Sequence, residues 1–117
     1  MSYNVETMLD QLVSRSAITE VLHRYARLID EQDFDAVAAL FTADCVAHYG
    51  AREGDTLTSP SEVIDWIRTQ LRGVRATSHH ISNVEIDFID SDHAHLVFRA
   101  AAKRSCYVAR SGFVGVC

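Results

Sequence analysis

The stretch that decides the fold of this chain is SAITEVLHRYARLID, residues 16–30. Its apolar residues recur at spacings of three and four, which places them in one stripe along an α-helix. Ser14 precedes the expected helix, and the polar run Asp30-Glu31-Gln32 is expected to end it. The stripe consists of Ile18, Val21, Leu22, Tyr25, Leu28 and Ile29.

Helix signals also flank this stretch on both sides. Residues 1–13 are expected to form a short helix or an arm. Asp33 is the expected N-cap of a second helix, whose buried side chains would be Val37, Leu40 and Phe41. Ser59 is the expected N-cap of a third helix, with Pro60 at its first position and Gly73 at its end. The core side of this third helix would be formed by Val63, Ile64, Trp66, Ile67 and Leu71.

Strand patterns dominate the rest of the chain. Residues 45–49 read as a short strand, and residues 50–59 are rich in turn formers. Residues 78–90 alternate in polarity, and a turn at 90–92 predicts that residues 93–104 return as an antiparallel partner. Residues 106–116 are expected to add one more strand, weakened by two glycines. Three helices followed by consecutive antiparallel strands predict an α+β fold.

Composition narrows the functional class. A chain of 117 residues suits a single domain spanning 1–117. The net charge of −5 argues against a surface for nucleic acid or anionic membranes. No apolar run reaches the roughly 18 residues that a membrane span needs, and no leader pattern is evident. The three cysteines have neither zinc-site nor disulfide-framework spacing, so a cytoplasmic protein is expected.

Ligand patterns for metals and cofactors are absent from the sequence. The histidines at 23, 48, 93 and 95 read as surface or strand-face residues, and none has a convincing metal-ligand context. Cys45 reads as a small buried hydrophobe. No glycine-rich phosphate loop occurs, so no nucleotide cofactor is suggested. We therefore expect neither a metal nor a cofactor.

Two adjacent histidines open the first long strand, in TSHHISN at residues 77–83. Adjacent strand side chains point to opposite faces, so only one of His79 and His80 enters the interior. The apolar set Val84, Ile86 and Phe88 shares the parity of His80. A β-bulge between the two groups would instead place His79 inside. Periodicity alone leaves both open.

Several of these motifs resemble one known family. SRSAI at 14–18, YARLID at 25–30, DFD at 33–35, LFTADC at 40–45 and SHHISN at 78–83 are similar to SnoaL-like domains of the nuclear transport factor 2-like superfamily. The resemblance covers roughly residues 14–100. It implies a cone-shaped half-barrel, in which three helices pack on a curved, mostly antiparallel sheet around a deep apolar pocket. The region after residue 105 departs from the family pattern as a shortened or divergent C-terminal strand region.

The resemblance also implies a site. In the dehydratase and dehydrochlorinase branches, an Asp at the end of the first long helix pairs with a His on the strand after the third helix. Asp30 and His79 occupy those places, and Tyr49 falls near a tyrosine that polarises the substrate carbonyl. An Asp–His pair of this kind serves general acid/base chemistry. The candidate substrate-binding residues are His23 at the pocket mouth, Tyr25, Phe41, Trp66 and His80, of which Phe41 and Trp66 equally suit the core.

The first functional hypothesis is therefore a cofactor-independent acid/base enzyme acting on a small apolar or aromatic oxygenated molecule. The reaction would be a dehydration, an isomerisation or a cyclisation. The alternative is a non-catalytic binding or subunit-interaction module of the same fold, which predicts a filled pocket or no Asp–His contact. An epoxide hydrolase, with Arg68 or Arg99 in a carboxylate cluster, is a weaker alternative. A homodimer that covers the sheet face and its open edge is expected.

Overall fold

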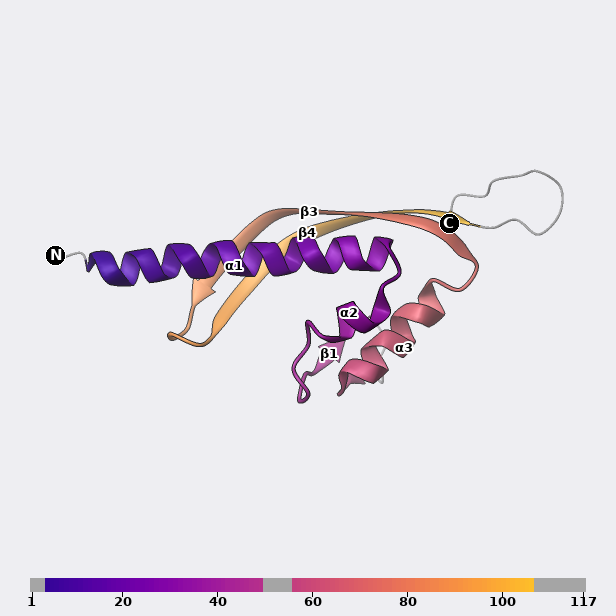
Figure 1. Cartoon of the computed structure of the whole chain (residues 1–117), viewed down its shortest axis with the longest axis horizontal. Helices are drawn as coiled ribbons and strands as arrows, with labels where there is room; N and C mark the ends of the chain where they lie inside the picture. Colours follow the sequence, from indigo (N-terminus) through magenta and orange to yellow (C-terminus); the bar gives the residue numbers. More distant parts are fainter. Residues whose placement is uncertain (1–3, 50–55, 107–117) are drawn as a thin grey trace.

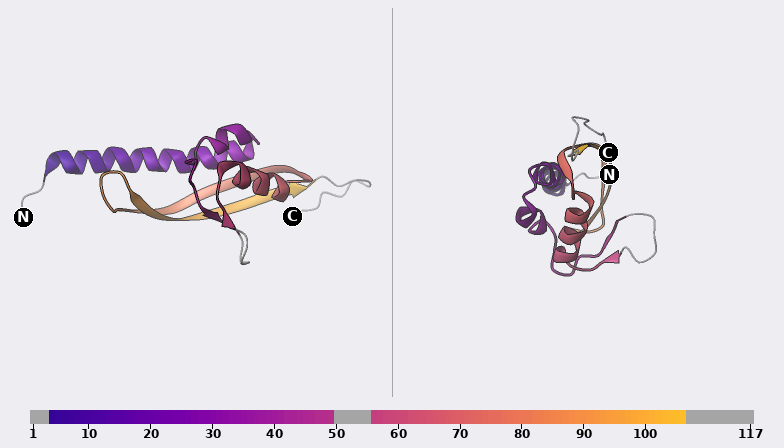
Figure 2. Two further views of the ribbon diagram at one scale, coloured as in Figure 1. Left: turned by 90° about the horizontal axis from the view of Figure 1, so that it is seen from below. Right: turned by 90° about the vertical axis from the view of Figure 1, so that its right-hand side faces the viewer.

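The computed structural model describes residues 4–49 and 56–106. Three helices and four strands follow one another as α1 (Val5–Asp30), α2 (Phe34–Ala38), β1 (Ala47–His48), β2 (Thr56–Leu57), α3 (Pro60–Gln70), β3 (Val74–Phe88) and β4 (Ala94–Cys106). The α+β prediction is confirmed. The long ribbon of β3 and β4 curves over α1, while α2 and α3 pack below one end of it (Figure 1). The extents of 68 × 27 × 25 Å make the molecule elongated (Figure 2).

Helix α1 begins earlier than the sequence pattern predicts. Its N-cap is Asn4, whose side chain accepts a hydrogen bond from the Thr7 backbone N–H, and the helix continues without interruption to Asp30. The predicted start after Ser14 is wrong because neither glycine nor proline breaks the preceding residues. Five apolar side chains of this early segment are exposed, so propensity and capping rather than burial form it: Val5, Met8, Leu9, Leu12 and Val13.

The caps of α2 and α3 are as the sequence predicts. The Asp33 carboxylate accepts from the Ala36 backbone N–H, and the Ser59 hydroxyl accepts from the Glu62 backbone N–H. Pro60 lies at the first position of α3. After the helix, Gly73 takes a φ of +79°, which turns the chain directly into β3.

Among the described residues, the strands form two separate two-stranded antiparallel sheets. β3 pairs with β4, and β1 pairs with the short β2, which lies in the segment that the sequence reads as turns. Ser82 pairs with Arg99 and Glu85 with Val97, so three steps along β3 match two along β4. This extra residue is a β-bulge. The strand predicted at 106–116 lies outside the described residues except for Cys106, which belongs to β4.

The hydrophobic core lies where the C-terminal half of α1 meets α2, α3 and the start of β3. Val37 and Val63 are fully buried there. No helix among the described residues is long and apolar enough to cross a membrane. The other buried members of the core are Leu28, Ile29, Ile64, Ile67, Leu71 and Val74.

Candidate functional site

The β-bulge decides which histidine faces α1. Asn83 sits in the bulge with a φ of +54°, a conformation that asparagine tolerates better than most residues. The extra residue reverses the alternation, so His79 before the bulge shares a face with Ile86 after it. His79 is half-buried, whereas His80 is exposed and its ring contacts the Ser78 hydroxyl at 2.9 Å. Of the two histidines that periodicity left open, His79 is therefore the one that faces α1.

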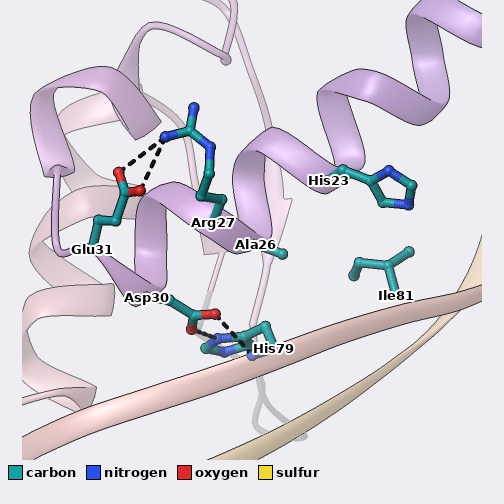
Figure 3. A pocket seen from close by; sticks show the side chains of 7 residues that line it. All are labelled: His23, Ala26, Arg27, Asp30, Glu31, His79 and Ile81. Atoms are coloured by element: carbon teal, nitrogen blue, oxygen red, sulfur yellow. Dashed lines mark hydrogen bonds and ion pairs between the residues drawn. The ribbon is translucent and has the colours of Figure 1, made fainter.

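The end of α1 places Asp30 directly above that face. Gln32 takes a φ of +57°, which turns the chain out of α1 toward the cap of α2. Asp30 is thus the last helical residue, and it points onto β3 (Figure 3). The neighbouring Arg27 and Glu31 form their own exposed ion pair at 3.0 Å on the helix surface. Arg27 is therefore paired with Glu31, and the Asp30 carboxylate bonds to residues of β3.

Three hydrogen bonds converge on the Asp30 carboxylate. The His79 ring Nδ1 lies 2.6 Å from Oδ1, and the Thr77 hydroxyl donates to the same oxygen at 2.7 Å. The His79 backbone N–H donates to Oδ2 at 3.0 Å. Thr77 and His79 share a strand face because they are two residues apart. The carboxylate is therefore held by the ring and the backbone N–H of His79 and by the hydroxyl of Thr77 on the same face.

This arrangement determines the charge of the pair and its tautomer. Burial raises the pKa of the Asp30 carboxyl, but the hydrogen bonds from His79 and Thr77 outweigh burial and hold that pKa below its ordinary value. An ionised Asp30 only accepts hydrogen bonds, so the proton of a neutral His79 ring sits on Nδ1. Nε2 is then the free acceptor, able to take a proton from a substrate.

Two hollows of about 460 Å³ each meet at His79. One is named the polar hollow because most of its lining side chains are ionisable, and Asp30 lies in its wall. The other is apolar, and His79 is joined there by two tyrosines and several aliphatic and aromatic side chains. Asp30 lines the polar hollow and not the apolar one, whereas His79 lines both. His79 therefore connects the Asp30 carboxylate, bound at Nδ1, to the apolar hollow. The apolar wall comprises Val21, Leu22, Tyr25, Leu40, Phe41, Tyr49, Phe98 and Ala100.

The two tyrosines of the apolar hollow bind one another. Their hydroxyl oxygens lie 3.0 Å apart. Burial, followed by the hydrogen bond with Tyr49, raises the pKa of Tyr25 far above its ordinary value, so Tyr25 stays protonated. Trp66 stacks on the Tyr49 ring with centroids 4.5 Å apart, and Phe41 meets Tyr25 edge to face at 6.3 Å.

Three of the five candidate substrate-binding residues line one of the two hollows that meet at His79, and the other two line neither. Tyr25 and Phe41 line the apolar hollow, and His23 lines the polar one. Trp66 packs behind Tyr49 instead of lining either hollow among the described residues, because α3 buries it against the core. His80 is excluded by strand alternation. Sequence reasoning missed the role of Thr77, although its two-residue spacing from His79 was a usable signal.

Within residues 4–49 and 56–106, no group of three or more His, Cys, Asp or Glu side chains is arranged to hold a metal ion.

Comparison with known proteins places the chain among similar folds. A family model described as SnoaL-like domain matches residues 10–107. A candidate scytalone dehydratase from Novosphingobium aromaticivorans DSM 12444 is 26% identical with a TM-score of 0.79, over 89% of this chain and 68% of that one. A hexachlorocyclohexane dehydrochlorinase, LinA type 2, is 20% identical with a TM-score of 0.71, over 84% and 66%.

A third similar structure is an NTF2-like protein with a cystatin-like fold from Novosphingobium aromaticivorans. It is 23% identical with a TM-score of 0.65, over 97% of this chain and 71% of that one. No curated protein sequence matches significantly. The chain thus spans about two thirds of the length of the first two structures.

Proposed function

Because the chain belongs to the SnoaL-like domain family, we propose that it is a cofactor-independent acid/base enzyme acting on a small apolar or aromatic molecule that carries oxygen. The observation that carries the proposal is the Asp30–His79 contact of 2.6 Å at the edge of an apolar hollow. In this proposal His79 is the base, Asp30 orients and balances it, and Tyr49 binds the substrate oxygen.

The chemical step follows from the free nitrogen of His79. Nε2 takes a proton from a carbon beside a carbonyl, and the electron pair of that C–H bond moves toward the carbonyl oxygen. The Tyr49 hydroxyl donates a hydrogen bond to the oxygen as its negative charge develops. The ring becomes an imidazolium whose charge is balanced by Asp30. A ligand seated against the apolar wall would displace water from His79 and Tyr49, which strengthens both interactions.

Three outcomes of that enolate share this first step. If a hydroxyl or halide lies on the next carbon, the electron pair expels it and a C=C bond forms; for a hydroxyl, the imidazolium returns the proton to the departing oxygen. Without such a leaving group, the imidazolium returns the proton to another carbon of a conjugated enolate, or the carbanion attacks a second carbonyl in an aldol-type cyclisation and the imidazolium protonates the alkoxide that forms. One similar structure is described as a dehydratase, so we place elimination first.

The alternatives are less well supported. A non-catalytic module predicts a filled pocket or no Asp30–His79 contact, and both the hollow and the contact count against it. An epoxide hydrolase needs an arginine near the carboxylate. Arg68 lies over the Phe34 ring at 5.1 Å, and Arg99 is exposed on β4, so neither joins Asp30.

We further propose that the enzyme is a homodimer joined through the sheet. β4 has β3 as its only partner among the described residues, and Val97 is 52% exposed. A second copy would cover the strand edge and this side chain. Light scattering at micromolar concentration should give twice the chain mass of 13.1 kDa, and a value equal to the chain mass would reject the dimer.

The proposed function is tested by a reaction that needs no leaving group. We expect the wild-type protein to catalyse exchange of the acidic C–H protons of 2-tetralone with deuterated water, followed by ¹H NMR. β-Hydroxy ketones and β-chloro ketones then test for loss of water or chloride. A wild-type exchange rate no higher than that of H79A would contradict the proposal.

A further inference from the structure

The hydrogen-bonded hydroxyls of Tyr25 and Tyr49 together retain one proton that their mutual bond does not use. Each hydroxyl carries one proton, and one of the two protons is used in the bond between the oxygens, which lie 3.0 Å apart. The other proton is left to point elsewhere. Both residues line the apolar hollow, so that proton is available to a ligand that occupies the hollow.

The 3.0 Å distance between the oxygens allows either hydroxyl to donate. Burial and the hydrogen bond with Tyr49 raise the pKa of Tyr25, which fits a bond in which Tyr25 is the donor, and we take this direction. Tyr49 then accepts from Tyr25, and its own proton remains free. A hydroxyl that accepts a hydrogen bond becomes a stronger donor, because chains of hydrogen bonds polarise one another.

The rings are held more firmly than a lone surface tyrosine would be. Trp66 stacks on Tyr49 with an interplanar angle of 27°, and Phe41 packs edge to face on Tyr25. Tyr25 is also on α1, five residues or about 7.5 Å of helix before Asp30. The same helix therefore positions the tyrosine pair and the carboxylate of the proposed base.

We propose that Tyr25 is a positioning residue that holds the Tyr49 hydroxyl over the apolar hollow, so that Tyr49 donates its free proton to one acceptor oxygen of the ligand. The chemical class of ligand is a carbonyl compound or a phenolate with an apolar body. The inference rests on the proposed function in taking the apolar hollow as the substrate site. It goes beyond that function in assigning Tyr25, which contacts the ligand oxygen only through Tyr49.

The experiment is a double-mutant cycle with 4-nitrophenolate as the probe, because its visible absorption shifts when its oxygen is hydrogen-bonded. We expect Tyr49→Phe to weaken probe binding about ten-fold and Tyr25→Phe about five-fold, as for the loss of one hydrogen bond. Because Tyr25 acts through Tyr49, the double variant should bind no more weakly than Tyr49→Phe alone. Thr69→Val, which removes a hydroxyl bound only to the Asp65 carbonyl on α3, should leave binding unchanged.

A packing role for Tyr25 predicts a different result. Phe41→Leu loosens the packing around Tyr25 without removing a hydroxyl, so its effect should add to that of Tyr49→Phe. Additive effects of Tyr25→Phe and Tyr49→Phe, wild-type affinity in Tyr25→Phe, or no probe binding by the wild type would each overturn the inference. If no substrate is turned over but the cycle is non-additive, the proposed function fails and the tyrosine assignment stands.

Discussion

Replacing Asp30 by asparagine changes the charge and the donor pattern of the pair while keeping its shape. The carboxylate accepts three hydrogen bonds, at 2.6, 2.7 and 3.0 Å. An asparagine side chain has one accepting oxygen and one donating NH₂ group. The oxygen is expected to accept from the His79 backbone N–H, because that group can only donate and its direction is fixed by the strand. The NH₂ group then faces Thr77, whose hydroxyl turns to accept, and the His79 ring.

The His79 ring then has to change its tautomer. Facing a donor, Nδ1 of His79 has to accept, so the proton moves to Nε2, and the nitrogen that faces the substrate is no longer a base. We expect the exchange rate to fall by at least about 100-fold, the usual scale of a lost general base. The loss of charge-assisted bonding should lower the free energy of unfolding by about 2 kcal/mol. For this chain length the unfolding midpoint should fall by about 8 °C.

The assay pairs deuterium exchange into 2-tetralone with thermal unfolding followed by circular dichroism. Asp33→Asn is the matched control: it makes the same substitution three residues away, where asparagine caps α2 as well as aspartate does. It should change neither rate nor midpoint appreciably. An Asp30→Asn protein with a lowered midpoint and an undiminished exchange rate would refute the tautomer reasoning.

Three further predictions concern stability. Thr77→Val removes a hydrogen bond that favours ionised Asp30 and should cost about 1 kcal/mol near neutral pH. Because the folded-state pKa of Asp30 is lowered, this difference from wild type should shrink as the pH falls below about 4, and urea denaturation at about pH 7 and pH 3 checks it. Val63→Ala, at a fully buried position, should cost about 2 kcal/mol in the same assay, whereas Val97→Ala, at an exposed one, should cost far less. Asn83→Val places a β-branched residue at a φ of +54° and should cost about 1–2 kcal/mol, while Asn83→Gly should not; equal midpoints for the two would argue against the bulge.

Much of the fold was readable from local signals. The stripe of α1, the caps Asp33 and Ser59 and the turn at Gly73 each act within a few residues, so sequence spacing captures them. The start of α1 was missed although the apolar residues between Val5 and Val13 recur at helical spacings, because that pattern does not distinguish one continuous helix from a separate short one. The short strand β2 depends on pairing with β1, which is a tertiary event.

The site was predictable only in part, because its residues come together from distant segments. The contact between Asp30 and His79 was expected from the family resemblance, and the structure contains it. Residue alternation alone left His79 and His80 open, because the bulge at Asn83 reverses parity and no local pattern announces it. The Tyr25–Tyr49 hydrogen bond joins α1 to the end of β1 across the fold, so no spacing within either segment indicates it.

In the proposed mechanism His79, held by Asp30, removes a proton from a ligand in the apolar hollow. The most direct measurement compares deuterium exchange into 2-tetralone by the adjacent variants His79→Gln and His80→Gln, because these side chains share a strand but point to opposite faces. We expect His79→Gln to lose at least about 100-fold in rate and His80→Gln to keep the wild-type rate. A large loss in His80→Gln with His79→Gln still active would contradict the claim.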